Sequence, residues 1–129
     1  MAQPAARKGD RVTAIDMHLI QPPGPTSPVS VPHPFSGIID GGTSANVTIG
    51  GAAAATKDST ATNTPPHIPI GGSFVNPPSN KGTITTGSAT VTINSKAAAR
   101  AGDTARTCND PVDLPVGTVV AVGTVTIGG

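Results

Sequence analysis

The sequence predicts an all-β protein: a short, tapered β-structure with pseudo-threefold symmetry and long loops rich in proline and glycine. An Ala-Ala core recurs three times along the 129 residues, and recurrence of this kind is typical of a repeat architecture. Each copy is later followed by Val-Thr-Ile, whose apolar-polar-apolar alternation is typical of a half-buried strand. The 16 glycines and 14 prolines interrupt nearly every window that is long enough for a helix.

We divide the predicted single domain, residues 1–129, into three repeat units at about 5–51, 52–96 and 97–129. The first and third units open on Ala-Ala-Arg-x-Gly-Asp, and the middle copy, residues 53–58, has lost the Arg and the Gly. The repeated Arg-x-Gly-Asp predicts a turn, in which Gly supplies backbone freedom and Asp bonds local amides.

The closing segments of the units, residues 37–50, 82–94 and 117–128, each begin Gly-x-Ile or Gly-x-Val and end Val-Thr-Ile. We interpret each as a short hairpin with a glycine-containing turn between its two halves. One such hairpin is marginal alone, so we expect three of them to enclose a shared core, with the alanine pairs packed where the strands converge. The proline-rich segments before them are predicted to be loops.

Composition excludes several classes of function. The 8 basic and 7 acidic residues leave a net charge of +1 without a basic cluster, which argues against a nucleic-acid partner. No run of 18 apolar residues could span a bilayer. The N-terminus lacks the apolar stretch of a signal peptide, so we expect synthesis in the cytoplasm without an N-terminal export signal. The single cysteine excludes an internal disulfide and leaves a metal as the remaining staple.

The four side chains best suited to a metal are His18, His33, His67 and Cys108, which are all the histidines and cysteines of the chain. Three histidines and one cysteine fit a closed tetrahedral site for one structural Zn²⁺. His18, His67 and Cys108 follow the three repeat cores at offsets of 8, 9 and 5 residues. His33 lies in the longer loop of the first unit, and prolines flank both His33 and His67, which restricts the backbone there.

Two other interpretations of these residues stay open. The first is that they are ordinary loop histidines and a small buried cysteine. The second is a catalytic zinc with water in place of His33, the least certain ligand. A catalytic site usually needs a nearby general base, and the chain has no Glu, which favours a structural metal.

Several of these stretches resemble one known family, the PAAR-repeat proteins. They are Pro-Ala-Ala-Arg at 4–7, the second Ala-Ala-Arg at 98–100, Gly-Ser-Ala-Thr-Val-Thr-Ile-Asn at 87–94, and Cys108. The resemblance implies the sharpened tip of a contractile injection machine, of the type VI secretion or phage-tail-like extracellular kind. It also implies a β-rich cone on a trimeric spike, with a zinc ion near the apex held by three histidines and a cysteine, here His18, His33, His67 and Cys108. The degenerate middle copy and the long proline-rich loop at 21–35 depart from the family pattern.

From the resemblance we expect a non-enzymatic tip that caps a trimeric spike protein, one copy per trimer, and contacts the target envelope during injection. We expect it to leave the cell as part of the assembled particle. The unpaired edges of the Val-Thr-Ile strands predict a spike-binding surface made of Val47, Ile49, Val91, Ile93, Val125 and Ile127. The alternatives are an adapter that binds effectors non-covalently at the spike tip and, less favoured, a zinc-dependent envelope hydrolase. The type of injection system stays open.

Overall fold

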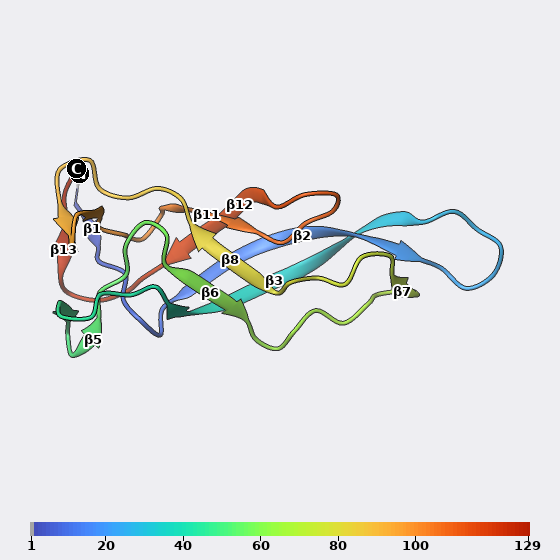
Figure 1. The fold of residues 1–129 in the computed structure, drawn as a ribbon, viewed down its shortest axis with the longest axis horizontal. Coiled ribbons are helices and arrows are strands. Elements are labelled where there is room, and N and C mark those ends of the chain that lie inside the picture. Colours follow the sequence, from blue (N-terminus) through green and yellow to red (C-terminus); the bar gives the residue numbers. More distant parts are fainter. Residues whose placement is uncertain (1) are drawn as a thin grey trace.

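The computed structural model describes residues 2–129 and confirms the all-β prediction. No helix occurs in these residues, and hence none long and apolar enough to cross a membrane. The strands, labelled in Figure 1, are β1 (Gln3–Pro4), β2 (Arg11–Gln21), β3 (Val29–Gly41), β4 (Thr48–Ile49), β5 (Ala52–Ala53), β6 (Thr60–Asn63), β7 (Ser73–Phe74), β8 (Lys81–Ile84), β9 (Thr92–Ile93), β10 (Lys96–Ala97), β11 (Thr104–Thr107), β12 (Leu114–Val120) and β13 (Thr126–Ile127).

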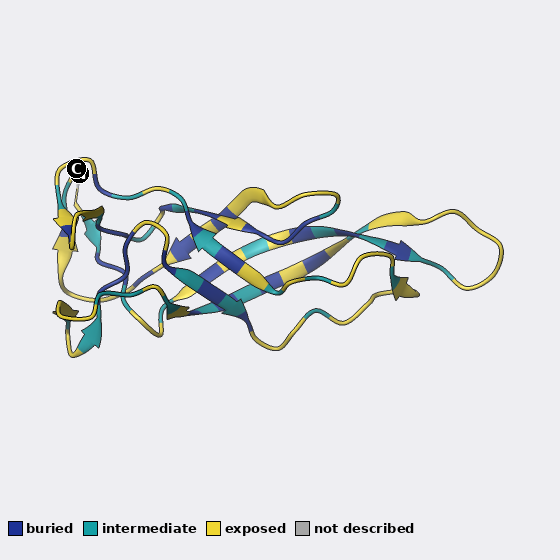
Figure 2. Cartoon of the chain, viewed as in Figure 1, coloured by how far each residue is buried: buried dark blue, intermediate teal, exposed yellow. Residues whose placement is uncertain are grey.

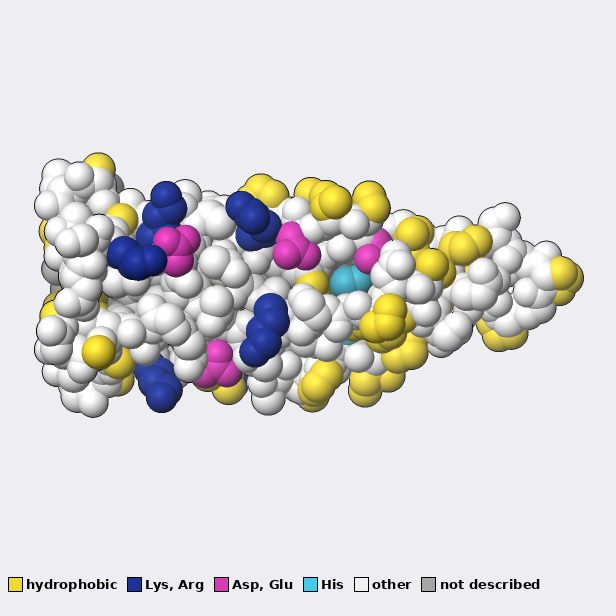
Figure 3. All heavy atoms as spheres, viewed as in Figure 1, with side chains coloured by type: hydrophobic (Ala, Val, Ile, Leu, Met, Phe, Trp, Pro, Cys, Tyr) yellow, Lys and Arg dark blue, Asp and Glu magenta, His cyan; other side chains and the backbone are white. Residues whose placement is uncertain are grey.

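Six of the strands close into a barrel. The order is β12-β11-β8-β6-β3-β2, and β12 also pairs with β2, so the sheet has no free edge along this stretch. β7 adds to the far end of β2, where Ile20 is paired with Phe74. The molecule is wide at the end that carries the short ribbons and narrows towards the β2–β3 connection, as Figures 1 and 3 show. This is the expected tapered β-cone.

β2 and β3 form the longest feature, an antiparallel pair that runs from Arg11↔Ile38 to Ile20↔Val29. The prediction that the proline-rich stretch around His33 is a loop is therefore wrong, because residues 29–34 lie in β3. Proline is tolerated there because β6 pairs only with the stretch of β3 from Gly37 onwards, which leaves the outer edge of β3 without a partner at Pro32 and Pro34.

Three two-stranded ribbons lie at the wide end: β4–β5, β9–β10 and β1–β13. Each contains one Val-Thr-Ile, but its partner is not the one predicted. Val-Thr-Ile pairs with the alanine segment of the next unit, across Gly50-Gly51 in one ribbon and Asn94-Ser95 in another. All four turn residues have positive φ, between 53° and 88°, as a two-residue hairpin turn requires. The third Val-Thr-Ile pairs with residues Gln3–Pro4, which joins the two ends of the chain.

The Gly-x-Ile or Gly-x-Val half of each closing segment belongs to the barrel instead. Gly37, Gly82 and Gly117 lie on β3, β8 and β12, and a Cβ added at Gly37 would stand 2.7 Å from Phe35 Cε1. A Cβ at Gly82 would stand 3.3 Å from the Cζ of the same ring. Gly37 and Gly82 therefore leave the space that the Phe35 side chain fills, whereas a Cβ at Gly117 would stand 3.0 Å from the Ala105 carbonyl oxygen and from Thr107 Cγ2.

The repeated turn forms as predicted, in all three copies. Asp10 Oδ2 accepts a hydrogen bond from the Arg7 amide at 3.0 Å, and Asp103 Oδ2 accepts one from the Arg100 amide at 2.7 Å. In the degenerate copy, Ser59 Oγ takes the place of the carboxylate and accepts from the Thr56 amide at 2.9 Å. The glycine position has φ of 96° at Gly9 and 89° at Gly102. Its equivalent in the middle copy, Asp58, adopts the same left-handed conformation at 77°.

The core has two parts, coloured dark blue in Figure 2. Towards the wide end, Ala5, Ala54 and Ala98 pack with Ile93 and Ile127. The larger part fills the barrel. Its buried members are Ala6, Val12, Phe35, Ile39, Ala55, Ala61, Ile84, Ala99, Ala105, Cys108, Val119 and Ala121. At its narrow end, apolar side chains give way to a buried polar group that includes Asp16, His18 and His33.

Candidate metal centre

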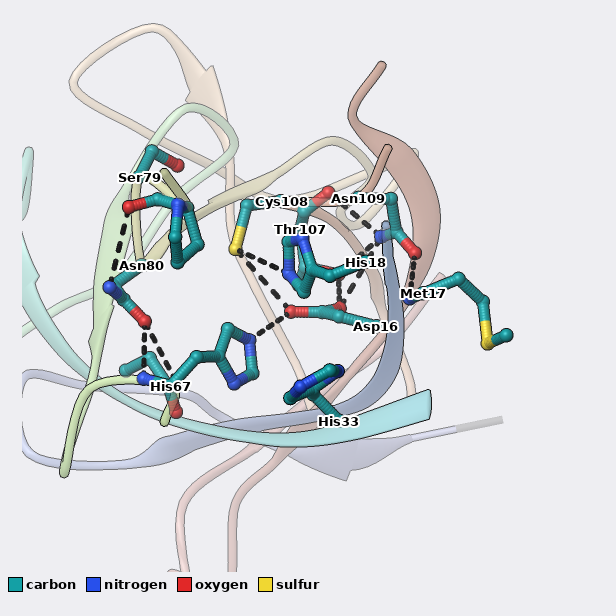
Figure 4. Close-up of polar contacts among 12 residues, drawn as sticks. Asp16, Met17, His18, His33, His67, Ser79, Asn80, Thr107, Cys108 and Asn109 are labelled. Carbon is teal, nitrogen blue, oxygen red and sulfur yellow. Dashed lines mark hydrogen bonds and ion pairs between the residues drawn. The ribbon is translucent and has the colours of Figure 1, made fainter. Parts of the chain in front are cut away.

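The four residues predicted to bind metal lie close together in the interior, at the narrow end of the barrel core, and Figure 4 shows their side chains. β2 supplies His18, β3 supplies His33, the segment after β6 supplies His67, and Cys108 directly follows β11. His18 and His33 are 1% exposed, Cys108 is 3% exposed, and the His67 side chain is 2% exposed. The ring centroids of the three histidines lie 4.9 to 5.7 Å apart. Cys108 Sγ lies 3.8 Å from His18 Nε2.

Strand alternation explains the inward direction of two of these side chains. On β2 the buried positions include Val12, Asp16, His18 and Ile20, and on β3 they include His33. Successive side chains of a strand point to opposite faces, so His18 and His33 necessarily face the interior together with the barrel core. The sequence interpretation placed His33 in a loop, and that part of it is wrong.

The structure adds one residue that sequence reasoning missed. Asp16 is fully buried. One potential ligand atom from each of Asp16, His18, His67 and Cys108 can be chosen so that all four atoms lie within 4.8 Å of one another. This group could hold a metal ion. The sequence did carry a signal for Asp16, because it stands two residues before His18 and therefore on the same face of any strand that includes both. His33 lies beside this group rather than within it.

Each histidine has an acceptor beside one ring nitrogen. His33 Nδ1 lies 2.9 Å from the Val31 carbonyl oxygen, and His67 Nε2 lies 2.8 Å from Asp16 Oδ2. His18 Nδ1 lies 3.4 Å from Asp110 Oδ2, which is a charge contact and not a well-formed hydrogen bond. Histidines that bind metals commonly donate the second ring N–H to a carboxylate or a backbone carbonyl. The His33 and His67 rings are therefore oriented in the manner of metal ligands.

His33 Nε2 is buried and has no hydrogen-bond partner. Because Nδ1 faces a carbonyl oxygen and must donate to it, Nε2 carries a free lone pair directed into the protein. A buried polar atom without a partner costs free energy, and a metal ion would satisfy it. This observation favours His33 as a donor even though it stands outside the tightest group.

Burial and, to a smaller extent, the neighbouring Asp16 carboxylate together raise the pKa of the Cys108 thiol to about 11. The Asn80 amide and the Ser79 hydroxyl act in the opposite direction. Burial also lowers the pKa of His18, with a further contribution from His67, while Asp110 opposes the shift. Without a metal the site thus favours a neutral imidazole at His18 and a protonated thiol, and metal binding must displace the thiol proton.

Neighbouring side chains fix the less regular parts of the site. Asn80 Oδ1 accepts hydrogen bonds from the His67 amide at 2.8 Å and from Asn63 Nδ2 at 3.1 Å. Phe74 packs against both His18 and His33, with centroid distances of 5.7 and 5.5 Å. Phe35 lies 6.0 Å from the His67 ring. The two phenylalanines of the chain therefore enclose the polar group from two sides and restrict water around it.

The donor chemistry fits a transition metal. Imidazole nitrogen suits zinc, copper, iron and nickel, and thiolate suits softer ions, so that a mixed set of imidazole and thiolate donors is typical of zinc. A pocket of about 380 Å³ between β3 and residues 63–70 reaches His33 and His67 from outside.

The chain is thus a tapered β-barrel with three ribbons at its wide end and, inside, a buried group of imidazoles, a carboxylate and a thiol that could hold a metal ion. Comparison with family models identifies a PAAR motif in residues 76–129. This confirms the resemblance to PAAR-repeat spike-tip proteins. No curated protein and no solved structure matches the chain. The matched segment contains β8 to β13 and Cys108, whereas the three histidines lie before it.

Proposed function

We propose that this protein is the structural, zinc-bearing tip of a contractile injection apparatus, seated with its wide end on a trimeric spike and delivered with the particle. The observation that carries the proposal is the PAAR motif on a cone whose wide end repeats one ribbon three times. A single chain with three similar edges suits a threefold partner, because each edge can meet an equivalent strand of a different subunit.

The residues of the wide end refine the proposed contact. Ile93 and Ile127 of the predicted surface are 8% and 7% exposed and pack within this chain, so we do not assign them a direct spike contact. Val47 and Val125 are exposed. The central threonine of each ribbon, Thr48, Thr92 and Thr126, is exposed as well. We propose that these exposed valines and threonines form the spike-binding face. They are Val47, Val125, Thr48, Thr92 and Thr126.

Co-purification with the trimeric spike of the same particle tests this proposal. Thr92→Arg and Thr126→Arg, which place charge on the wide end, should abolish capture of the spike. Thr26→Arg is the matched control, because Thr26 is exposed in the β2–β3 connection at the narrow end. The complex should contain one tip per trimer. Three tips per trimer, or loss of capture with Thr26→Arg alone, would contradict the proposed arrangement.

We infer that the metal is structural and that the protein is not an enzyme. Asp16 is the carboxylate closest to the site, and both of its oxygens already accept hydrogen bonds, so it is poorly placed to act as a general base. The alternative of an envelope hydrolase predicts turnover of peptidoglycan or ester substrates by the zinc-loaded protein, and we expect none.

A second candidate function is a non-covalent adapter for effectors. Apolar side chains are exposed on the narrower half of the cone, among them Ile68 at 73% and Val112 at 61%, and Figure 3 shows such side chains gathered there while Lys and Arg lie towards the wide end. A surface of this kind can contact either cargo or the target envelope. Capture of effectors that is lost on Ile68→Ser and Val112→Ser, with spike binding retained, would support the adapter.

A further inference from the structure

The Asp16 side chain has four polar contacts in the neighbourhood of the metal centre. Oδ1 accepts from Thr107 Oγ1 at 2.5 Å and from Asn109 Nδ2 at 3.3 Å. Oδ2 lies 2.8 Å from His67 Nε2 and 3.5 Å from Cys108 Sγ. Four groups thus surround one fully buried carboxylate, and Figure 4 shows it between Cys108, His67 and the Thr107–Asn109 side.

The partners of Asp16 are themselves fixed. Thr107 is fully buried, and Asn109 is 6% exposed. Asn109 Oδ1 accepts the Met17 amide at 2.7 Å, while its Nδ2 also donates to the Thr107 carbonyl at 3.2 Å. Residues on β2 and the end of β11 are therefore tied together through this carboxylate. Asp16 connects the strand that carries His18 to the segment that carries Cys108.

Charge gives a reason for a carboxylate at this place. No Lys or Arg in residues 2–129 forms an ion pair with Asp16, and its one partner of that kind is His67. An isolated buried carboxylate is costly. A divalent ion bound by one thiolate and neutral imidazoles retains one positive charge, which Asp16 would neutralise without entering the coordination sphere.

We propose that Asp16 is a positioning residue for the metal centre: its carboxylate holds His67 through Nε2–H, which leaves Nδ1 as the ring nitrogen free to bind a metal, and it orients Cys108 and balances the charge. Its oxygens are saturated by four groups, whereas His33 Nε2 has no partner. The metal donors are then His18, His33, His67 and Cys108, with Asp16 behind them. This inference rests on the proposed metal centre and goes further by separating donors from the residue that positions them.

Cobalt(II) and zinc binding to the purified chain test the inference. Asp16→Asn keeps the size and removes the charge. Thr107→Val keeps the charge and removes one hydrogen bond to Oδ1, together with the long contact from Asn109 Nδ2 to Thr107 Oγ1 at 3.4 Å. Asp40→Asn, an exposed change on β3, is the matched control. Competition with a chromophoric chelator should show zinc affinity about 10- to 100-fold lower for Asp16→Asn, a smaller loss for Thr107→Val and no change for Asp40→Asn. The thiolate and d–d bands of bound cobalt should keep their positions in all three variants.

A second measurement needs no variant. Nitrogen-15 spectra of the histidine rings in the zinc-loaded protein should show His67 protonated at Nε2 and metal-bound at Nδ1. Binding of His67 through Nε2, a changed cobalt spectrum in Asp16→Asn, or unchanged zinc affinity in that variant would overturn the positioning role. Failure of the unaltered chain to bind either ion would instead overturn the metal centre itself, and the inference with it.

Discussion

The amide of Ala6 donates a hydrogen bond to the carbonyl of Ala99 at 2.9 Å. Two equivalent bonds, from Ala99 to Ala55 at 3.1 Å and from Ala55 to Ala6 at 3.0 Å, close a ring of backbone hydrogen bonds. All three alanines are fully buried. The three repeat units therefore meet at one layer where their backbones approach closely, and only a small side chain can occupy such a position without displacing its neighbours.

A larger side chain in this layer should destabilise the fold. Ala99→Val and Ala55→Val should each lower the free energy of unfolding by about 1–3 kcal/mol, because added methyl groups in a packed core force side chains and backbone to shift. Ala45→Val, at an exposed position, should stay within roughly 0.5 kcal/mol of the unaltered protein. Urea unfolding of the three variants measures this. Equal stability of Ala99→Val and Ala45→Val would show that the layer has room.

The repeated turn makes a separate prediction at Gly102. Its φ is 89°, and a Cβ added there would meet nothing within 4 Å. The cost of Gly102→Ala should therefore come from the backbone alone, about 1–2 kcal/mol for a left-handed L-residue. Gly123 has equally open space and no positive φ, so Gly123→Ala should change stability very little. A similar loss in both variants on thermal unfolding would contradict the turn assignment.

The parts of the fold that local pattern controls could be predicted. Val-Thr-Ile does form strands, and the Arg-x-Gly-Asp turn recurs even where Ser59 replaces the acid. The pairing of Val-Thr-Ile was missed because the predicted unit boundaries, near residues 51 and 96, fall at the ribbon turns themselves. Pairing of Gln3–Pro4 with β13 joins the two ends of the chain, and no local pattern in the sequence predicts a pairing between segments so far apart.

The candidate site follows the same division. The residue types alone predicted that His18, His33, His67 and Cys108 lie close together in one region. Their setting could not be predicted, because prolines beside His33 obscured a strand whose outer edge is free at that point. Asp16 was missed because only histidines and the cysteine counted as candidate donors, although Asp16 and His18 stand on one strand face.

Removal of the metal should destabilise the protein and loosen one segment most. β2, β3 and β11 are held by the barrel, whereas His67 lies outside the strands and depends on Asn80 and Asp16. We expect hydrogen exchange after chelation to rise most around His67. The metal contributes about 4 kcal/mol when free zinc exceeds Kd 1,000-fold, so chelation should lower Tm.

Cys108→Ala should lower Tm more than any single histidine substitution, because it also removes the anionic donor. The Tm of Cys108→Ala should no longer respond to chelator, which serves as the internal control. A melting curve of the unaltered protein that is the same before and after metal is stripped would show that the metal does not stabilise the fold.

Zinc binding should release protons, and the raised pKa of Cys108, about 11, fixes how many. At pH 7.5 the metal-free thiol is protonated and must lose its proton to bind, so we expect close to one proton per zinc. Affinity should then rise about tenfold per pH unit between pH 7 and 9. Titration calorimetry in two buffers of different ionisation enthalpy counts the protons directly, and a count near zero would mean that the thiol is not a donor.

The stability of the metal-free protein should depend on pH in the opposite direction. Folding raises the pKa of Cys108 from 9.0 to about 11. The contribution of this thiol to stability is therefore full below pH 9 and is lost as the pH rises towards 11. Alkaline pH should thus strengthen metal binding while it weakens the metal-free protein, and the difference in Tm between the zinc-loaded and metal-free forms should widen from pH 7 to pH 10.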